Sequence, residues 1–448
     1  MSGAAPASAA SGRTLGFWMA TALVVGNIIG AGIFAMPAAL APYGLNALGG
    51  WLVTVLGCAC LALAFAELAR RFPRDDGPYA YTLRAFGPWA AFFVMWCYWV
   101  SVWVANAAIA IAVIGYVLYF VPGLAANPLA PPIAALALVW LFVLIILRGA
   151  RTAGWVQVLT TALKLLPSFA VILLGLGVLI TDPHLYTQHL PPNPASWREV
   201  ASVSSLALFA MLGLECATIP AARVRDPARN IPRATLAGTL IAAFLYVCIS
   251  VVPMFLIPQA QLAASSAPFA DLFAQHLGGQ WGGWIAAFCA ISGLGALNGW
   301  TLVIGEVTQT MARHGGFPQA LARENSRAAP ARAFILSGIV TSVMLLMNYV
   351  GSVGSVFAFF SVAATILTIP LYVLDPLAVL RLRRAGDTTR AVGPFTAAAA
   401  ILAVVYCAWI VWGVEAKPLI WGTLLGLAGI PVYFVCTRVQ RQQASAQA

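Results

Sequence analysis

Long apolar stretches separated by short polar ones run along almost the whole chain. A transmembrane helix needs about 20 predominantly apolar residues, and stretches of that length recur here. Their apolar runs are continuous, unlike the alternating strands of about 10 residues in a membrane β-barrel. The pattern predicts an all-α polytopic membrane protein with 12 transmembrane helices, at roughly 15–40, 46–67, 85–120, 131–148, 154–181, 200–221, 234–257, 281–311, 333–350, 354–379, 393–413 and 418–437.

The composition excludes a water-soluble protein. Of the 448 residues, 62% are hydrophobic and only 8% are charged, whereas a soluble domain carries about 25% charged residues. Disorder is excluded because it needs low hydrophobicity and high charge. The eight cysteines lie in apolar segments without metal-type spacing, and the four histidines fall in predicted loops. We therefore expect no disulfide, metal or cofactor, and we do not expect an enzyme.

The net charge of +11 is explained by orientation rather than by nucleic acid, which we do not expect as a partner. With the N-terminus inside, 21 of the 24 Lys and Arg residues fall in loops or tails on the inner side. Cytoplasmic loops of membrane proteins collect such residues. We expect a multi-pass protein of the bacterial inner membrane with both termini in the cytoplasm, the lipid bilayer being its surroundings.

Two predicted helices contain interruptions. The first carries Gly26–Gly32, with Gly30 and Gly32 close together, and the sixth carries Gly213 just before Glu215. Irregular backbone at membrane depth is tolerated only where it lines a cavity or is buried in protein. Interrupted helices at matching places in two repeats point to the binding site of a transporter. The alternative is that the glycines only allow close helix packing.

Three ionisable residues within the apolar segments stand out, and each is a functional candidate by default. Glu215 follows the proposed break in the sixth segment, with a permanently neutral structural acid as its alternative. Lys164 lies in the fifth segment, about 10 residues from its start, so its ammonium could instead reach the interface. Glu306 lies in the inner half of the eighth segment, where a water-exposed helix end is an equal alternative to a functional role. Asn106 and Trp300 add an amide and an indole in the third and eighth segments, although a lone Trp is more often a packing residue.

With these residues in place, the chain resembles the amino acid–polyamine–organocation transporters and, among them, the bacterial arginine/agmatine antiporters. The resemblance covers roughly residues 15–434. It rests on these stretches: Gly26–Phe34, Gly50–Thr54, Tyr79–Tyr81, Phe86–Pro88, Tyr98–Trp99, Gly213–Glu215, Asp226–Pro232 and Gly299–Leu302.

The resemblance implies a five-plus-five inverted repeat of the LeuT-like type with two additional C-terminal helices. It also implies that the Ile28 carbonyl and the amides of Gly30, Ala31 and Gly32 hold the α-amino and α-carboxylate groups of an amino acid substrate. Carried over by position, the remaining residues would line the pocket or control access to it. Asn106, Phe209 and Trp300 would line it, Tyr98 would help to close its cytoplasmic side, and Glu215 would take part in gating or proton coupling.

Three positions depart from the arginine/agmatine antiporters. Ala31 and Phe209 replace a serine and a tryptophan, which removes a hydroxyl contact and weakens a cation–π platform. Lys164 replaces an apolar residue and resembles the lysine that stands in for a sodium ion in neutral and proton-coupled amino acid transporters. Beside Glu215 it would make the empty site nearly neutral, which favours a zwitterion over a dication.

These expectations define one transporter domain at 15–437, with repeats at about 15–181 and 200–379 and extra helices at about 393–437. The tails 1–14 and 438–448 are expected in the cytoplasm. The predicted function is sodium-independent secondary-active amino acid transport, by exchange or with protons. The alternatives are arginine/agmatine-type or polyamine exchange and, with less support, a channel or a substrate sensor. The sequence allows a homodimer without specifying one.

Overall fold

Helices are the only regular secondary structure in the described part of this computed structural model. It describes residues 16–30, 32–72, 77–125, 127, 129–147, 163, 165–189, 193–215, 226–323, 325, 330–348, 351–385 and 392–447. The first half contains α1 (Phe17–Ile28), α2 (Gly32–Leu40), the 3-10 helix η1 (Ala41–Tyr43), α3 (Asn46–Arg71), α4 (Pro78–Phe86), α5 (Pro88–Phe120), α6 (Pro122–Ala125), α7 (Ala130–Leu147), α9 (Leu165–Thr181), α10 (Leu185–Gln188) and α11 (Trp197–Ala210).

The second half of the chain begins with a long helix and continues in the same all-helical manner. It contains α12 (Pro227–Leu256), α13 (Gln259–Ala264), α14 (Pro268–Leu277), α15 (Gly279–Arg313), α16 (Gln319–Ala322), α17 (Ala331–Asn348), α18 (Val353–Ala385), α19 (Pro394–Gly413), α20 (Ala416–Leu427) and α21 (Gly429–Gln447). Each of the twelve predicted segments therefore contains described helical residues.

Eight helical stretches among the described residues are long and apolar enough to cross a membrane. They are Asn46–Arg71, Pro88–Phe120, Ala130–Leu147, Arg229–Leu256, Gly279–Arg313, Val353–Leu382, Pro394–Gly413 and Ala416–Arg438. Shorter apolar helices occupy Phe17–Gly26, Gly32–Tyr43, Leu165–Thr181 and Ala331–Met347. The prediction of a polytopic helical membrane protein is confirmed at this level.

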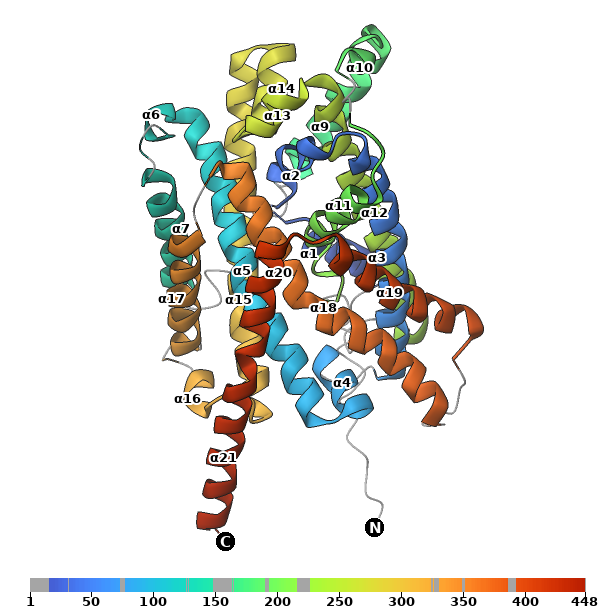
Figure 1. The fold of residues 1–448 in the computed structure, drawn as a ribbon, viewed down its shortest axis with the longest axis vertical. Helices are drawn as coiled ribbons and strands as arrows, with labels where there is room; N and C mark the ends of the chain where they lie inside the picture. Colours follow the sequence, from blue (N-terminus) through green and yellow to red (C-terminus); the bar gives the residue numbers. More distant parts are fainter. Residues whose placement is uncertain are drawn as a thin grey trace, which may run out of the picture.

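Helix α5 forms the centre of the bundle. Its most apolar stretch is 94% buried, and α15 and α18 pack along it (Figure 1). At the periphery, the corresponding stretch of Ala416–Arg438 is only 17% buried. Large apolar side chains are exposed on outer helices, as Leu173 and Ile180 are on α9. Lipid, which is as apolar as these side chains, accounts for this surface.

Glycines allow the closest helix contacts in the bundle. In α9, a methyl group added at Gly175 would lie 2.7 Å from a methyl carbon of Val252 in α12. The hydroxyl of Tyr186 would lie 3.0 Å from the same added carbon. Gly177, two residues further along α9, has open space at its Cβ position. The two glycines therefore form a matched pair for testing this contact.

We expect Gly175→Ala to destabilise the fold by about 1–3 kcal/mol, because the added methyl group overpacks the α9–α12 contact. Gly177→Ala should be neutral or stabilise the protein by up to about 1 kcal/mol, because alanine favours the helix. Thermal unfolding of the detergent-solubilised variants, followed by size-exclusion chromatography, measures both effects. Equal transition temperatures for the two variants would contradict this account of the contact.

Candidate functional site

The predicted interruption of the first segment is present as a gap between α1 and α2. Helix α1 ends at Ile28, Ile29 has an extended backbone, and α2 begins at Gly32. The Tyr246 hydroxyl bridges the break, donating to the Ile28 carbonyl at 3.0 Å and accepting from the Gly30 N–H at 3.3 Å. One side chain of α12 thus satisfies two main-chain groups that the helix has released.

Tyr246 itself is fixed by burial and stacking. It is only 1% exposed, and its ring stacks on that of Trp51 in α3 with the centroids 5.9 Å apart. The sequence analysis did not single out Tyr246, because an isolated tyrosine in an apolar helix carries no signal of the chain opposite it. A carbonyl oxygen has two lone pairs, so the Ile28 carbonyl can still accept a second hydrogen bond.

The second interruption follows α11. This helix ends at Ala210, and Met211–Gly213 form a turn in which Gly213 has a φ of +103°. Glycine adopts such a backbone without steric cost, whereas a side chain there would be strained. The turn leads directly into Glu215, which is 1% exposed.

The Glu215 carboxylate joins three parts of the fold. Its Oε1 accepts a hydrogen bond of 2.8 Å from the Tyr98 hydroxyl of α5. Its Oε2 accepts one of 2.6 Å from the Tyr372 hydroxyl of α18 and one of 3.2 Å from the Gly213 N–H. Tyr372 is a further residue that the sequence analysis missed. The carboxylate therefore links the two long central helices at the level of the second break.

The two breaks meet at one small central cavity of about 20 Å³. That space holds about one water molecule. Backbone and side chains from five regions line it: Ile28, Gly30, Gly32, Ala105, Ile109, Phe209, Ala210, Leu212, Tyr246 and Trp300. The structure thus brings together five of the residues singled out from the sequence, namely Ile28, Gly30, Gly32, Phe209 and Trp300. The site is closed around a space too small for an amino acid.

The other candidate residues have different positions. Asn106 is 3% exposed and does not line the cavity; its amide nitrogen donates to the Thr301 hydroxyl at 3.3 Å, next to Trp300. Tyr98 does not line the cavity either; its hydroxyl donates to the Glu215 carboxylate at 2.8 Å. Ala31 and Lys164 lie outside the described residues, as does the side chain of Glu306.

A second, larger cavity begins about one helical turn from the central one. It has a volume of about 450 Å³, and Ala39, Leu206 and Val356 are among its lining residues. The rings of Phe209 and Phe357, next to these positions in α11 and α18, meet edge to face with centroids 5.8 Å apart. A methyl group at Gly32 would lie 2.8 Å from the Phe209 ring, so glycine permits this close approach.

A second buried carboxyl group lies on α18, one turn beyond Tyr372. Asp375 is fully buried, and its Oδ1 accepts a hydrogen bond of 2.8 Å from the Thr82 hydroxyl of α4. Its Oδ2 has no hydrogen-bond partner among the described residues. Asp375 was not singled out from the sequence, because its partner Thr82 is distant along the chain.

Comparisons with known proteins agree with this architecture. The family model described as amino acid permease matches residues 15–435. The chain belongs to the amino acid permease family. It is 29% identical over 427 residues to the putrescine transporter of Escherichia coli K12, covering 95% of this chain and 97% of the relative.

Two further relatives of this amino acid permease are antiporters by name. The cadaverine/lysine antiporter of Escherichia coli K12 is 30% identical over 348 residues, covering 77% of each chain. The arginine/ornithine antiporter of Pseudomonas aeruginosa is 32% identical over 338 residues, covering 73% of this chain and 70% of the relative. This permease is therefore a transporter of the amino acid–polyamine–organocation superfamily and not an enzyme. It is a multi-pass protein of the bacterial inner membrane.

We expect Tyr246→Phe to reduce substrate binding by about tenfold, because the Ile28 carbonyl and the Gly30 N–H lose the hydroxyl that orders the break. Two hydrogen bonds of about 0.5–1.5 kcal/mol each are lost, and about 1.4 kcal/mol corresponds to tenfold in affinity. Tyr186→Phe is the matched control, since its hydroxyl donates to the Gly175 carbonyl at 2.7 Å, away from the central cavity. Binding titrations of both purified variants measure the effect, and equal affinities would contradict the assignment of Tyr246.

Proposed function

We propose that this permease is a sodium-independent secondary-active transporter that exchanges amino acids, with Glu215 available for proton coupling. The observation that carries the proposal is the meeting of two helix breaks at one central cavity. Released main-chain groups at a helix end bind the charged ends of an amino acid, because N–H groups attract a carboxylate and carbonyls attract an ammonium group. Phe209 and Trp300 then form the walls that select the side chain.

Tyr98, Glu215 and Tyr372 form the barrier on one side of the site. Each hydrogen bond to a charged group contributes about 1.5–3 kcal/mol, so the two tyrosines together contribute roughly 3–6 kcal/mol to closure. A shift between mostly closed and mostly open requires about 5.5 kcal/mol of differential binding. The barrier is therefore of the size that substrate binding can overcome.

The barrier between the central cavity and the larger cavity is held by a weaker interaction. An aromatic pair such as Phe209 and Phe357 contributes about 0.5–1.5 kcal/mol beyond the area it buries. The larger cavity, with Glu415 and Lys417 among its lining residues, lies beyond this pair. We assign the larger cavity to the periplasmic side and Tyr98–Glu215–Tyr372 to the cytoplasmic side. In this assignment the structure is closed at the centre and close to opening outwards.

The same proposal includes the topology predicted from the sequence. One transporter domain at about 15–437 would contain 12 membrane-spanning helices. Two inverted repeats of five helices each would lie at about 15–181 and 200–379, and two further helices would follow them. Both tails would lie in the cytoplasm. Alternating access would come from rocking one group of helices against the rest, which opens the two barriers in turn.

A cationic substrate is the second candidate. The three relatives are named for putrescine, for cadaverine and lysine, and for arginine and ornithine. Among the described residues, the lining of the central cavity contains no basic side chain. The faces of Phe209 and Trp300 would suit a cation as well as an apolar group. Lys164 favours a zwitterionic substrate instead, because its positive charge beside Glu215 would make the empty site nearly neutral.

Uptake of labelled amino acids into proteoliposomes, with and without sodium, tests the proposal. We expect uptake to be unchanged without sodium and at least tenfold faster when the vesicles are preloaded with an unlabelled substrate. Uptake that requires sodium would overturn the proposal. Displacement by a neutral amino acid supports a zwitterionic substrate, and displacement by agmatine or putrescine supports the cationic candidate.

The same assay applied to Lys164→Ala separates the two substrate classes further. If Lys164 supports a neutral site, its removal should reduce uptake of a neutral amino acid at least tenfold while membrane insertion stays normal. Unchanged uptake by this variant would show that Lys164 has no part in binding.

We expect Tyr372→Phe to open the cytoplasmic barrier, because it removes one of the two tyrosine hydrogen bonds to Glu215. A loss of about 1.5–3 kcal/mol corresponds to a shift of roughly 10- to 150-fold in the open population. Hydrogen–deuterium exchange of peptides from α4 and the first half of α5 should rise. Tyr116→Phe is the control in the other half of α5, where the hydroxyl donates to the Phe34 carbonyl at 2.8 Å. A similar rise in both variants would contradict the assignment.

A further inference from the structure

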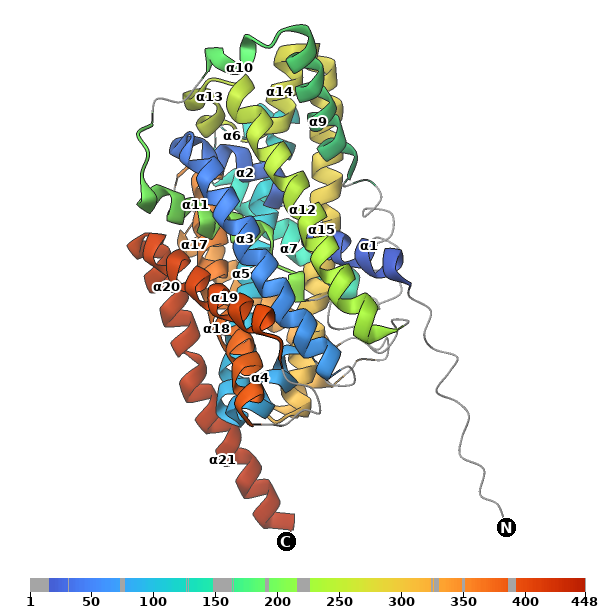
Figure 2. The same cartoon turned by 90° about the vertical axis from the view of Figure 1, so that its right-hand side faces the viewer.

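An open groove lies where α12 begins, away from the central cavity. It has a volume of about 630 Å³. Helix α1 forms one wall with Phe17, and α12 forms the other. Figure 2 shows α1 and the beginning of α12 at the same edge of the molecule. We call this space the α12 groove.

The α12 wall of the groove changes from basic to apolar along the helix. Arg229 and Arg233 are one turn apart, and Leu236 and Leu240 continue the same face. Both arginines are exposed, and the side chain of Leu240 is 42% exposed. The stretch from Arg229 to Leu240 spans about 16 Å at the helical rise of 1.5 Å per residue. That is about half of the roughly 30 Å hydrocarbon thickness of a bilayer, so the face runs from the headgroup level into the apolar region.

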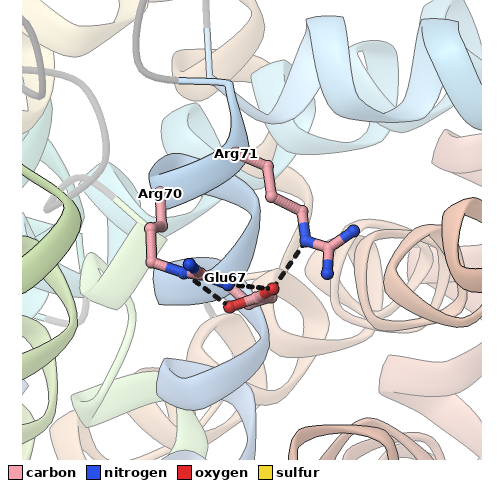
Figure 3. Close-up of polar contacts among 3 residues, drawn as sticks. All are labelled: Glu67, Arg70 and Arg71. Atoms are coloured by element: carbon pink, nitrogen blue, oxygen red, sulfur yellow. Dashed lines mark hydrogen bonds and ion pairs between the residues drawn. The ribbon is translucent and has the colours of Figure 1, made fainter. Parts of the chain in front are cut away.

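The arginines of the groove form no ion pair among the described residues, unlike the arginines at the end of α3 nearby. There, Glu67 accepts hydrogen bonds from Arg70 at 2.7 and 2.9 Å, and Arg71 pairs with the same carboxylate (Figure 3). Ala69 lies between Glu67 and these arginines in the sequence and packs with Ile231 of α12. The end of α3 is therefore next to the beginning of α12.

Arg229 and Arg233, in contrast, form no ion pair with any described residue. Asp226 also lines the groove without pairing with either of them. The two guanidinium groups and the one carboxylate leave a net positive charge at the headgroup level.

We infer that the α12 groove binds the headgroup of an anionic phospholipid. The two guanidinium groups match the planar, bidentate geometry that arginine uses for phosphate oxygens. An acyl chain then lies along Leu236 and Leu240, continuing towards Phe244, which is 65% exposed. Basic pockets between helices on the cytoplasmic side of membrane proteins recognise such headgroups. The lipid would join α1 to α12, two helices that meet at the first break.

Lipid retention by the full-length protein tests this inference. Native mass spectrometry after exchange into defined lipid compares phosphatidylglycerol with phosphatidylcholine of the same acyl chains. We expect one tightly bound phosphatidylglycerol on the wild type and at least tenfold weaker binding to the Arg229→Gln/Arg233→Gln variant. Arg381→Gln is the matched control, because Arg381 is an exposed arginine at the end of α18 whose guanidinium lies over the Phe86 ring, outside the groove.

Equal retention by the double variant and the wild type would overturn the inference. Equal retention of phosphatidylcholine would do the same. Glycerol 3-phosphate is the probe for a simple anion site, and displacement of the lipid by it at equal concentration would show that the acyl chain is not recognised.

A measurement on the wild type does not depend on folding of the variant. Phosphatidylglycerol with a photoreactive acyl chain should label peptides covering Leu236–Phe244. Labelling confined to other helices would exclude the groove as the binding site.

Discussion

The structure depends on one constraint, which is that main-chain polar groups at membrane depth need partners because lipid offers none. The break after Ile28 and the turn at Gly213 both release such groups in the middle of the bundle. Tyr246 bridges the first break, and the Glu215 carboxylate accepts from the Gly213 N–H in the second. The same hydrogen bonds that make the breaks tolerable also place them around one cavity.

The hydrogen bonds that satisfy the released main-chain groups also have a part in the proposed transport cycle. Glu215 holds a released N–H and, at the same time, links α5 to α18 through Tyr98 and Tyr372. A change at this carboxylate, by protonation or by substrate binding, would therefore act on the backbone of the site and on its barrier together. On the opposite side, the aromatic contact of Phe209 and Phe357 involves no such bond. In the proposed cycle, this asymmetry would let one side open while the other stays closed.

The outer surface follows a related rule. Exposed apolar side chains cover helices that face lipid, and the charges gather near helix ends. At the end of α3, one carboxylate compensates two arginines, which suits a site buried in protein. At the start of α12, two arginines form no ion pair with any described residue and, in our proposal, bind a lipid headgroup. Neighbouring helix ends thus differ in whether their arginines are paired with a carboxylate among the described residues.

The sequence by itself determined the all-helical membrane character, the family resemblance and the places of the two helix breaks, because these depend on local composition and local motifs. It also pointed to Phe209, Trp300 and Glu215 as candidates, of which Phe209 and Trp300 line the central cavity. Only the tertiary structure decided which groups face these residues. Tyr246, Tyr372 and Asp375 were missed because their roles depend on the rotation and register of helices distant in sequence. Closure of the central cavity depends on the same packing, so no local pattern in the sequence could have revealed it.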